Sequence, residues 1–418
     1  MQQDKRFRLP FENPWRGLRG LPADVWIIFV TSLVNRAGVM ALPFLVLYLT
    51  EHLHVSAARA GFALSVYGVG SLLTGPISGR LSDRFGPFKV MQASLALTGV
   101  ILLVIPLAHD FTRVAILTFV WAVAADAVRP ATLSGLTDLV PPEQRKAAIA
   151  LNRLAVNLGM SVGPAVGGFL ALVSFPLLFV VDGLTSLAAA GVLSALLWAR
   201  RKSLAAELHH GVAAREGRAF AASTGVWRDR TAIILFAGVL LVSMVFMQNQ
   251  GAMPLYLVRD LGYKPSLYGM LFVLNTLLIV AIEVPVNVAM AHWPHRRALM
   301  LGAVLTAIGF GALAVAKSTT ALAVTVVFWT FGEMIFFPSS TAYVADIAPP
   351  GRNGAYMGAF VSMFSVALIV GPWAGTAALD RFGPVVAWSA VFVCGLAGMA
   401  VLAAVPGSRS HVVAQVEN

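Results

Sequence analysis

Several ionisable side chains stand inside long apolar stretches of the chain. Carboxylates occur there at Asp126, Glu283 and Glu333, and guanidinium groups occur at Arg36 and Arg129. An ionisable group in a hydrocarbon environment costs about 2.5–3.5 kcal/mol, so each of these side chains is a functional candidate. A carboxylate in such a place can bind and release a proton. We therefore predict that these five residues take part in proton coupling.

The spacing of these residues ranks them. Asp126 and Arg129 are three positions apart, so they share one face of a helix. They either neutralise each other or face a cavity. Glu333 has no charged residue three or four positions away, and Glu283 lies nearer the end of its apolar stretch. Glu333 and Asp126 are therefore the leading proton-coupling candidates.

The composition places these residues in a membrane. The chain is 58% hydrophobic and 12% charged, with a mean hydropathy of +0.80. Runs of about 20 apolar residues can cross a bilayer, where only helices or closed barrels satisfy the backbone. The runs lack the two-residue alternation of barrel strands. The sequence thus predicts an all-α integral membrane protein.

One stretch of the chain occurs twice at a constant offset of 208 positions. Each copy contains a Trp, a Pro, a Pro-Pro turn and a Gly-Pro pair, with one Asp. The matching members are Trp121 and Trp329, Pro130 and Pro338, Asp138 and Asp346, Pro141-Pro142 and Pro349-Pro350, and Gly163-Pro164 and Gly371-Pro372. An internal duplication follows, and duplicated halves around a central site are a recurring transporter design.

The apolar runs predict twelve spanning helices in two pseudo-symmetric halves. The expected segments are a cytoplasmic N-terminal segment, a first six-helix half, a cytoplasmic linker, a second half and a cytoplasmic tail, at 1–20, 21–199, 200–230, 231–406 and 407–418. Most of the 30 Lys and Arg residues fall in the loops on one side of this arrangement. Since positive loops stay inside, both termini are expected to be cytoplasmic.

The loop after the second predicted span has a distinctive sequence, Gly79-Arg80-Leu81-Ser82-Asp83-Arg84-Phe85-Gly86-Pro87-Phe88-Lys89. It resembles the inner loop of the major facilitator superfamily, which reads G-x-L-x-D-R-x-G followed by basic residues. Pro87 stands where that family has a basic residue, and Lys89 supplies the charge later. The resemblance covers nearly the whole chain and implies the fold of that superfamily, in a bacterial cytoplasmic membrane.

The resemblance also implies a gate that holds the two halves together in the outward-open state. Asp83 can face the positive end of the helix that begins near Arg352, and Arg84 can pair with Asp138. The alternative is a solvated loop whose charges only set topology. A topogenic loop needs neither Asp83 nor the two glycines. The predicted gate residues are Gly79, Asp83, Arg84, Gly86, Lys89 and Asp138.

The fifth predicted span carries a stripe of small residues. Gly159, Gly163 and Gly167 are four positions apart and share one face, which lets a neighbouring helix approach closely. Pro164 frees a backbone carbonyl, and Gly168 completes the run. This pattern resembles the antiporter motif of drug–proton exporters in the same superfamily. Its alternative is a general packing face.

Polar and aromatic residues at mid-span positions are candidates for substrate contact, although each of them can equally serve helix packing. The set is Asn35, Tyr67, Gln248, Asn249, Asn275 and Phe337. Asn35-Arg36 also resembles the first span of peptide transporters, with Asn35 where that family has Glu. We expect proton-coupled efflux of small amphipathic compounds. The alternatives are a dedicated metabolite exporter and a proton-coupled symporter of peptides or other small solutes.

Other classes of protein lack support in the sequence. The net charge of +11 lies in loops and does not indicate nucleic-acid binding, and the one cysteine, Cys394, lies in an apolar run. No H-E-x-x-H, G-x-S-x-G or P-loop pattern occurs. We expect no enzyme, no metal and no cofactor, with the proton gradient as the energy source. The expected partners are a small-molecule substrate, protons and lipid, and the protein is expected to be a monomer. A membrane receptor is a remote alternative.

Overall fold

The computed structural model describes residues 20–141, 144–207, 223–290, 292–349 and 352–406. These residues form helices and turns, and they contain no strand. The N-terminal segment 1–19, the linker residues 208–222, the tail 407–418, Pro142 and Pro350 lie outside the described residues. Predictions that concern them stay predictions.

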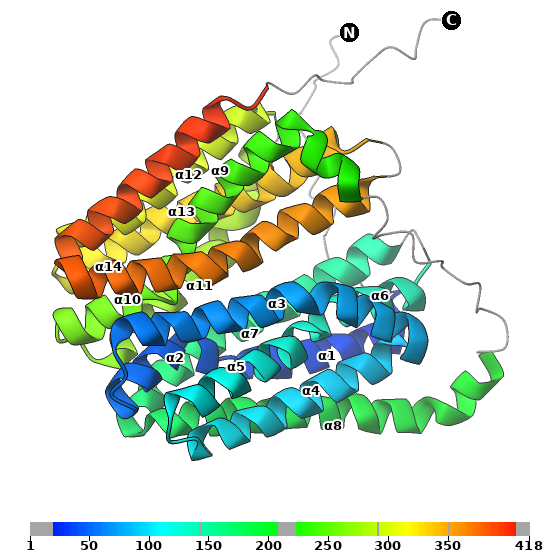
Figure 1. Ribbon diagram of the computed structural model, residues 1–418. Coiled ribbons are helices and arrows are strands. Elements are labelled where there is room, and N and C mark those ends of the chain that lie inside the picture. Colours follow the sequence, from blue (N-terminus) through cyan, green and yellow to red (C-terminus); the bar gives the residue numbers. More distant parts are fainter. Residues whose placement is uncertain (1–19, 142–143, 208–222, 291, 350–351, 407–418) are drawn as a thin grey trace, which may run out of the picture.

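The first half consists of α1 to α8 (Figure 1). Its helices are α1 Ala23–Gly38, α2 Ala41–Leu47, α3 Ala57–Phe85, α4 Pro87–Val104, α5 Phe111–Asp126, α6 Val128–Leu139, α7 Arg145–Val173 and α8 Phe175–Glu207. Short helices η2 Tyr48–His52 and η3 Ile105–Leu107 extend α2 and α4. The pairs α1–α2 and α5–α6 each form one broken span.

The second half consists of α9 to α14 and lies above the first half in Figure 1. Its helices are α9 Arg230–Phe246, α10 Ala252–Leu255, α11 Pro265–Ala289, α12 His295–Gly311, α13 Thr319–Ile347 and α14 Asn353–Ala403. Short helices η6 Ser223–Arg228, η7 Met247–Asn249, η8 Tyr256–Asp260 and η9 Ala312–Ala314 complete it.

The described residues provide twelve membrane spans, as the sequence predicts. Ten helices are long and apolar enough to cross a membrane. α3 qualifies when it is counted across a 43° bend between residues 75 and 77. α14 contains two spans, because Gly383 interrupts it with φ 78 and ψ 173, a left-handed conformation that glycine adopts without strain.

The internal repeat places a proline in the fourth span of each half, but the helix is interrupted in only one of them. Pro130 has no N–H group to donate to the carbonyl of Asp126, four residues earlier. The span is interrupted at Ala127, between α5 and α6. The repeat-equivalent Pro338 lies inside an unbroken α13. There the amide of Asn287 donates to the carbonyl of Met334, which Pro338 leaves free, at 3.5 Å.

The two halves touch along two seams, α3 with α14 and α7 with α11. We name the ends of the bundle the Asp83 end, which carries the loop after α3, and the Asp260 end, where η8 finishes. On the first seam, a Cβ atom on Gly68 would lie 2.8 Å from Ile369 Cγ1, and Ser71 is 3.5 Å from Ser365. Ser65 donates to the carbonyl of Ile369. The seam is closed over this stretch.

Toward the Asp83 end, the same seam is open. A Cβ atom built on Gly75 or Gly79 of α3 has no described heavy atom within 4 Å, and the same holds for Gly354 and Gly358 of α14. Tyr268, in contrast, ties the other end together by donating to the carbonyls of Pro43 at 3.2 Å and Asn249 at 2.7 Å. The structure therefore shows the halves closed at the Asp260 end and parted along the α3–α14 seam at the Asp83 end.

Candidate functional site

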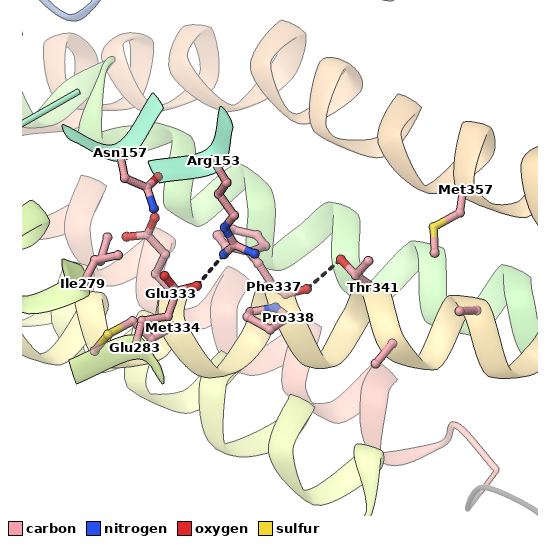
Figure 2. A pocket seen from close by; sticks show the side chains of 12 residues that line it. Arg153, Asn157, Ile279, Glu283, Glu333, Met334, Phe337, Pro338, Thr341 and Met357 are labelled. Carbon is pink, nitrogen blue, oxygen red and sulfur yellow. Dashed lines mark hydrogen bonds and ion pairs between the residues drawn. The ribbon is translucent and has the colours of Figure 1, made fainter. Parts of the chain in front are cut away.

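A cavity of about 530 Å³ lies between the two halves on the Asp83 side of the bundle. Its lining comes from α7, α11, α13 and α14, and Figure 2 shows the side chains from close by. Polar groups gather on one part of the wall, and the remainder is mostly apolar. The lining residues are Arg153, Asn157, Ile279, Glu283, Glu333, Met334, Phe337, Pro338, Thr341, Ala342, Ala345 and Met357. Three charged groups and several apolar side chains thus share one site.

Glu333 is the innermost carboxylate of this cavity. It comes from the middle of α13, and its Oε2 accepts a hydrogen bond from Nδ2 of Asn275 on α11 at 2.9 Å. Asn275 also donates to Oγ1 of Thr330 at 3.0 Å, which fixes the amide. No described basic group forms an ion pair with Glu333. A neutral amide is therefore its partner, and a proton or a ligand can supply the missing positive charge.

Glu283 comes from α11 and lies nearer the Asp83 end of the cavity than Glu333 does. Its Oε1 is 2.6 Å from the guanidinium of Arg153 on α7, so this ion pair joins the two halves. The Arg153 side chain is 64% exposed, and the Glu283 side chain is 16% exposed. Glu283 is thus neutralised by a residue of the other half, which the sequence did not predict.

Asp126 lies in the first half, at the end of α5. Its Oδ1 accepts from the hydroxyl of Tyr67 at 3.4 Å, and Ser71 also hydrogen-bonds to it. The alternative in which Asp126 and Arg129 neutralise each other is not observed: no ion pair joins the two among the described residues, and Arg129 is exposed. Ala127, where α5 ends, keeps helical torsion angles of φ −69 and ψ −22.

Tyr67 and Asp126 mirror Asn275 and Glu333 across the internal repeat. Asn275 is 208 positions after Tyr67, and Glu333 is 207 positions after Asp126. In both halves, an uncharged donor on the second helix contacts a carboxylate on the fourth. The repeat therefore places one hydrogen-bonded carboxylate in each half.

Arg36 immediately precedes the break between α1 and α2. The glycine stripe of α7 packs against this break: a Cβ atom on Gly163 would collide with the carbonyl of Val39, and one on Gly159 with Arg36. Gly167 lies against Met40 in the same way. Gly168, next to them, contacts Ser266 and Gly269 of the other half. The predicted antiporter motif is thus a close packing face, and it holds the broken first span.

Asp182 of α8 holds the other side of the break. Its Oδ2 accepts from the backbone N–H groups of Met40 at 3.2 Å and Ala41 at 3.1 Å, which begin α2 and have no partner in a preceding helical turn. The Asp182 side chain is buried and lies inside α8. Asn35, one turn earlier, donates to Ser186 at 3.2 Å.

The remaining substrate candidates divide into two groups. Phe337 lines the cavity, and Asn275 reaches it through Glu333. Gln248 is buried and donates to the carbonyl of Gly371 at 2.7 Å, while the backbone carbonyl of Asn249 accepts from Tyr268. In this state, Gln248 and Asn249 serve packing between helices at the closed end.

The predicted gate residues surround the open end. Asp83, Arg84, Lys89 and Asp138 are exposed, and no ion pair joins Arg84 to Asp138 among the described residues. Gly86 has φ +85 and directly precedes α4. In the second half, Asp346 instead has a partner, Nε2 of His295 at 2.9 Å.

Sequence reasoning did not predict the partners of Arg153 and Asp182. Both stand inside apolar runs, so their positions carried a signal. Their partners lie 130 and 142 positions away, and no local spacing indicates such pairs. Within the described part of the chain, no group of three or more His, Cys, Asp or Glu residues could hold a metal ion.

Comparisons with known proteins agree with this geometry. The model of the Major Facilitator Superfamily matches residues 27–249 and 235–416. YqjV, an MFS-type transporter of Bacillus subtilis, is 26% identical over 366 residues, 86% of this chain and 87% of the relative. A multi-drug resistance efflux pump, the PmrA homolog of Lactococcus lactis, is 29% identical over 157 residues, 37% of each chain.

A Na(+), Li(+), K(+)/H(+) antiporter of Planococcus maritimus is 21% identical over 81% of this chain and 85% of the relative. Among solved structures, a POT family transporter in complex with 5-aminolevulinic acid has a TM-score of 0.74 at 15% identity, covering 93% of this chain and 97% of that one. A D-xylose-proton symporter has a TM-score of 0.71 at 14% identity, covering 94% and 99%. These structures share the fold.

Proposed function

The chain belongs to the Major Facilitator Superfamily, a family of transporters, and we propose that it exports small amphipathic compounds in exchange for protons. The observation that carries this proposal is Glu333, a carboxylate at mid-span in the cavity, whose described partner is a neutral amide. The apolar wall suits amphipathic compounds, with Met334, Phe337 and Met357 as adaptable contacts.

Exchange follows from competition for Glu333. A ligand shifts a two-state carrier only by its differential affinity for the two states. When a proton neutralises Glu333, the cavity loses the charge that holds a cationic substrate. When the substrate occupies the site, the proton is released. The site therefore holds either the proton or the cationic substrate. Each of them is carried across in a different half of the cycle, so the two fluxes run in opposite directions.

The direction of transport rests on two further features. The glycine stripe of α7, whose sequence resembles the antiporter motif of drug–proton exporters, packs on the broken first span beside Arg36. The relatives include a protein named as a multi-drug resistance efflux pump. The distribution of Lys and Arg favours an Asp83 end on the cytoplasmic side of a bacterial membrane, and on that orientation the cavity opens toward the cytoplasm in this state. One chain contains the whole cavity, which supports a monomer as the working unit.

The seam between α3 and α14 supports the gate. Gly61 lies against Thr376, and Gly68, seven residues later on α3, lies against Ile369, seven residues earlier on α14. Continuing this register for eleven residues brings Gly79 to Gly358, and fifteen residues bring Asp83 to Gly354. Gly354 belongs to the first turn of α14, whose free N–H groups favour a negative charge. Closure at the Asp83 end therefore places Asp83 where its charge stabilises the closed gate.

Everted membrane vesicles test the proposal. In these vesicles, the cytoplasmic side faces the medium, and ethidium serves as an amphipathic cationic probe. We expect an acid interior to drive uphill accumulation of ethidium, and we expect Glu333→Gln to abolish it. The matched control is Asp260→Asn, because Asp260 lies at the other end of the bundle outside the cavity. Accumulation by Glu333→Gln at the wild-type rate would remove Glu333 from the coupling site and leave Asp126 as the candidate.

If ethidium is not a substrate, a ligand screen by melting-temperature shift identifies the probe to use instead. Accumulation that requires an acid exterior would identify a symporter. A compound that binds and causes proton uptake without any flux would identify a receptor. Either of the last two results, accumulation that requires an acid exterior or binding without flux, would overturn proton-coupled export.

A further inference from the structure

The seam between α7 and α11 stays in contact where the other seam has opened. Gly168 contacts Gly269 toward the Asp260 end. Arg153, fifteen residues earlier on α7, pairs with Glu283, fourteen residues later on α11. The two helices therefore keep one antiparallel register over about 21 Å, at 1.5 Å per residue. The Arg153–Glu283 pair closes this seam on the Asp83 side of the cavity.

The α3–α14 seam behaves differently in the same state. It is in contact at Gly68 and Ile369 and at Ser71 and Ser365, and it is open beyond that point. Gly79, eleven residues after Gly68, faces no described atom within 4 Å. The opening between the halves is thus asymmetric, with one seam parted and the other joined by an ion pair.

We propose that Arg153 and Glu283 are positioning residues that tether the two halves, so that α7 and α11 form the hinge on which the α3–α14 seam opens and closes. The inference rests on alternating access, which the proposed function requires. Beyond alternating access, the inference assigns different roles to the two seams: the α7–α11 seam is the hinge, and the α3–α14 seam opens and closes. The tether holds through the transport cycle and fixes the cavity wall that carries Glu283 beside Glu333.

The chemistry of the pair suits a tether. Arg153 is 64% exposed and Glu283 is 16% exposed, and a hydrogen bond between two ionised groups is about twice as strong as one between neutral groups. Removing Arg153 would leave Glu283 and Glu333 as two carboxylates in one cavity without a described cation, and like charges in a shared site repel. The only other polar residue of the cavity on α7 is Asn157, which carries no charge.

Distances between spin labels separate a hinge from a symmetric opening. Ile149 and Val288 are exposed and continue the α7–α11 register toward the Asp83 end, so labels there report the hinge. Leu81 and Val361 are exposed on α3 and α14, so labels there report the opening seam. In the wild-type protein, we expect one narrow hinge distance under all conditions, while the Leu81–Val361 distance changes with pH and with the ethidium probe.

Charge variants test the tether itself. We expect Arg153→Gln and Glu283→Gln to broaden the hinge distance and to slow transport by about tenfold, the size expected for losing one charge-assisted hydrogen bond. The double variant Arg153→Glu with Glu283→Arg should restore the narrow hinge distance. Arg113→Gln removes an ion pair that lies within one half, with Asp110, and should leave both distances unchanged. Melting temperatures exclude variants that fail to fold.

Two results would overturn the inference. One is a wild-type hinge distance that changes as much as the Leu81–Val361 distance. The other is a hinge distance that stays narrow in both single variants. The hinge distances of the charge variants are measured without substrate and at one pH, so a broadened hinge in Arg153→Gln and Glu283→Gln supports the tether even if proton-coupled export is wrong.

Discussion

Gly68→Ala should shift the protein away from the described state and toward the state that opens at the Asp260 end. The new Cβ atom would lie 2.8 Å from Cγ1 and 2.9 Å from the backbone nitrogen of Ile369 on α14. Overpacking of this kind costs about 1–3 kcal/mol. The gain in helix propensity, about 1 kcal/mol, applies to both states and cancels in their ratio. We expect a population shift of about 5- to 150-fold.

Gly79→Leu should have the opposite sign. Gly79 has no described neighbour within 4 Å in this state, but the seam register brings it to Gly358 when the Asp83 end closes. The added side chain would therefore hinder closure and trap the described state. Spin labels at Leu81 and Val361 provide the assay, with a longer distance expected for Gly79→Leu and a shorter one for Gly68→Ala. Shifts in the same direction, or no shift in either variant, would refute the seam register.

Three further outcomes follow from contacts at the site. Asp83→Asn should lower transport strongly at normal expression and lengthen the Leu81–Val361 distance, whereas an unchanged distance distribution would remove the gate role. Gly163→Leu should abolish export because its side chain must displace the carbonyl of Val39. The same change at Gly191, which has no described neighbour within 4 Å, should be tolerated. Normal transport by Gly163→Leu would show that the match to the antiporter motif is accidental. Asp182→Leu should destabilise the protein by about 1–3 kcal/mol, because the backbone N–H groups of Met40 and Ala41 lose their acceptor. Asp182→Asn keeps an oxygen there and should melt within a few degrees of wild type. Equal melting temperatures for both variants would contradict the role of Asp182 as that acceptor.

Hydrophobicity and the 208-residue repeat were sufficient to predict the twelve helices. Each span is a long apolar run, and Trp121 and Trp329 lie buried in matching places. The repeat also brought Asp126 and Glu333 to nearly equivalent positions, and their partners Tyr67 and Asn275 follow it as well. Patterns that act along one helix, or that repeat between halves, can be predicted from sequence.

Contacts between distant helices could not be predicted in this way. The alternative in which Asp126 and Arg129 neutralise each other rested on helical spacing, yet no ion pair joins the two among the described residues. Asp182 caps a helix that begins more than a hundred residues earlier, and Arg153 finds Glu283 in the other half. Such pairs depend on how the helices cross, which a single sequence does not specify.

The most direct test of proton coupling is the pH dependence of ethidium binding to the purified protein, compared between wild type and Glu333→Gln. A proton that competes for Glu333 should weaken wild-type binding as the pH falls, by up to about tenfold per pH unit for one proton. Glu333→Gln should bind ethidium with an affinity that does not change with pH. An unchanged pH dependence in Glu333→Gln, or wild-type binding that tightens as the pH falls, would contradict the account.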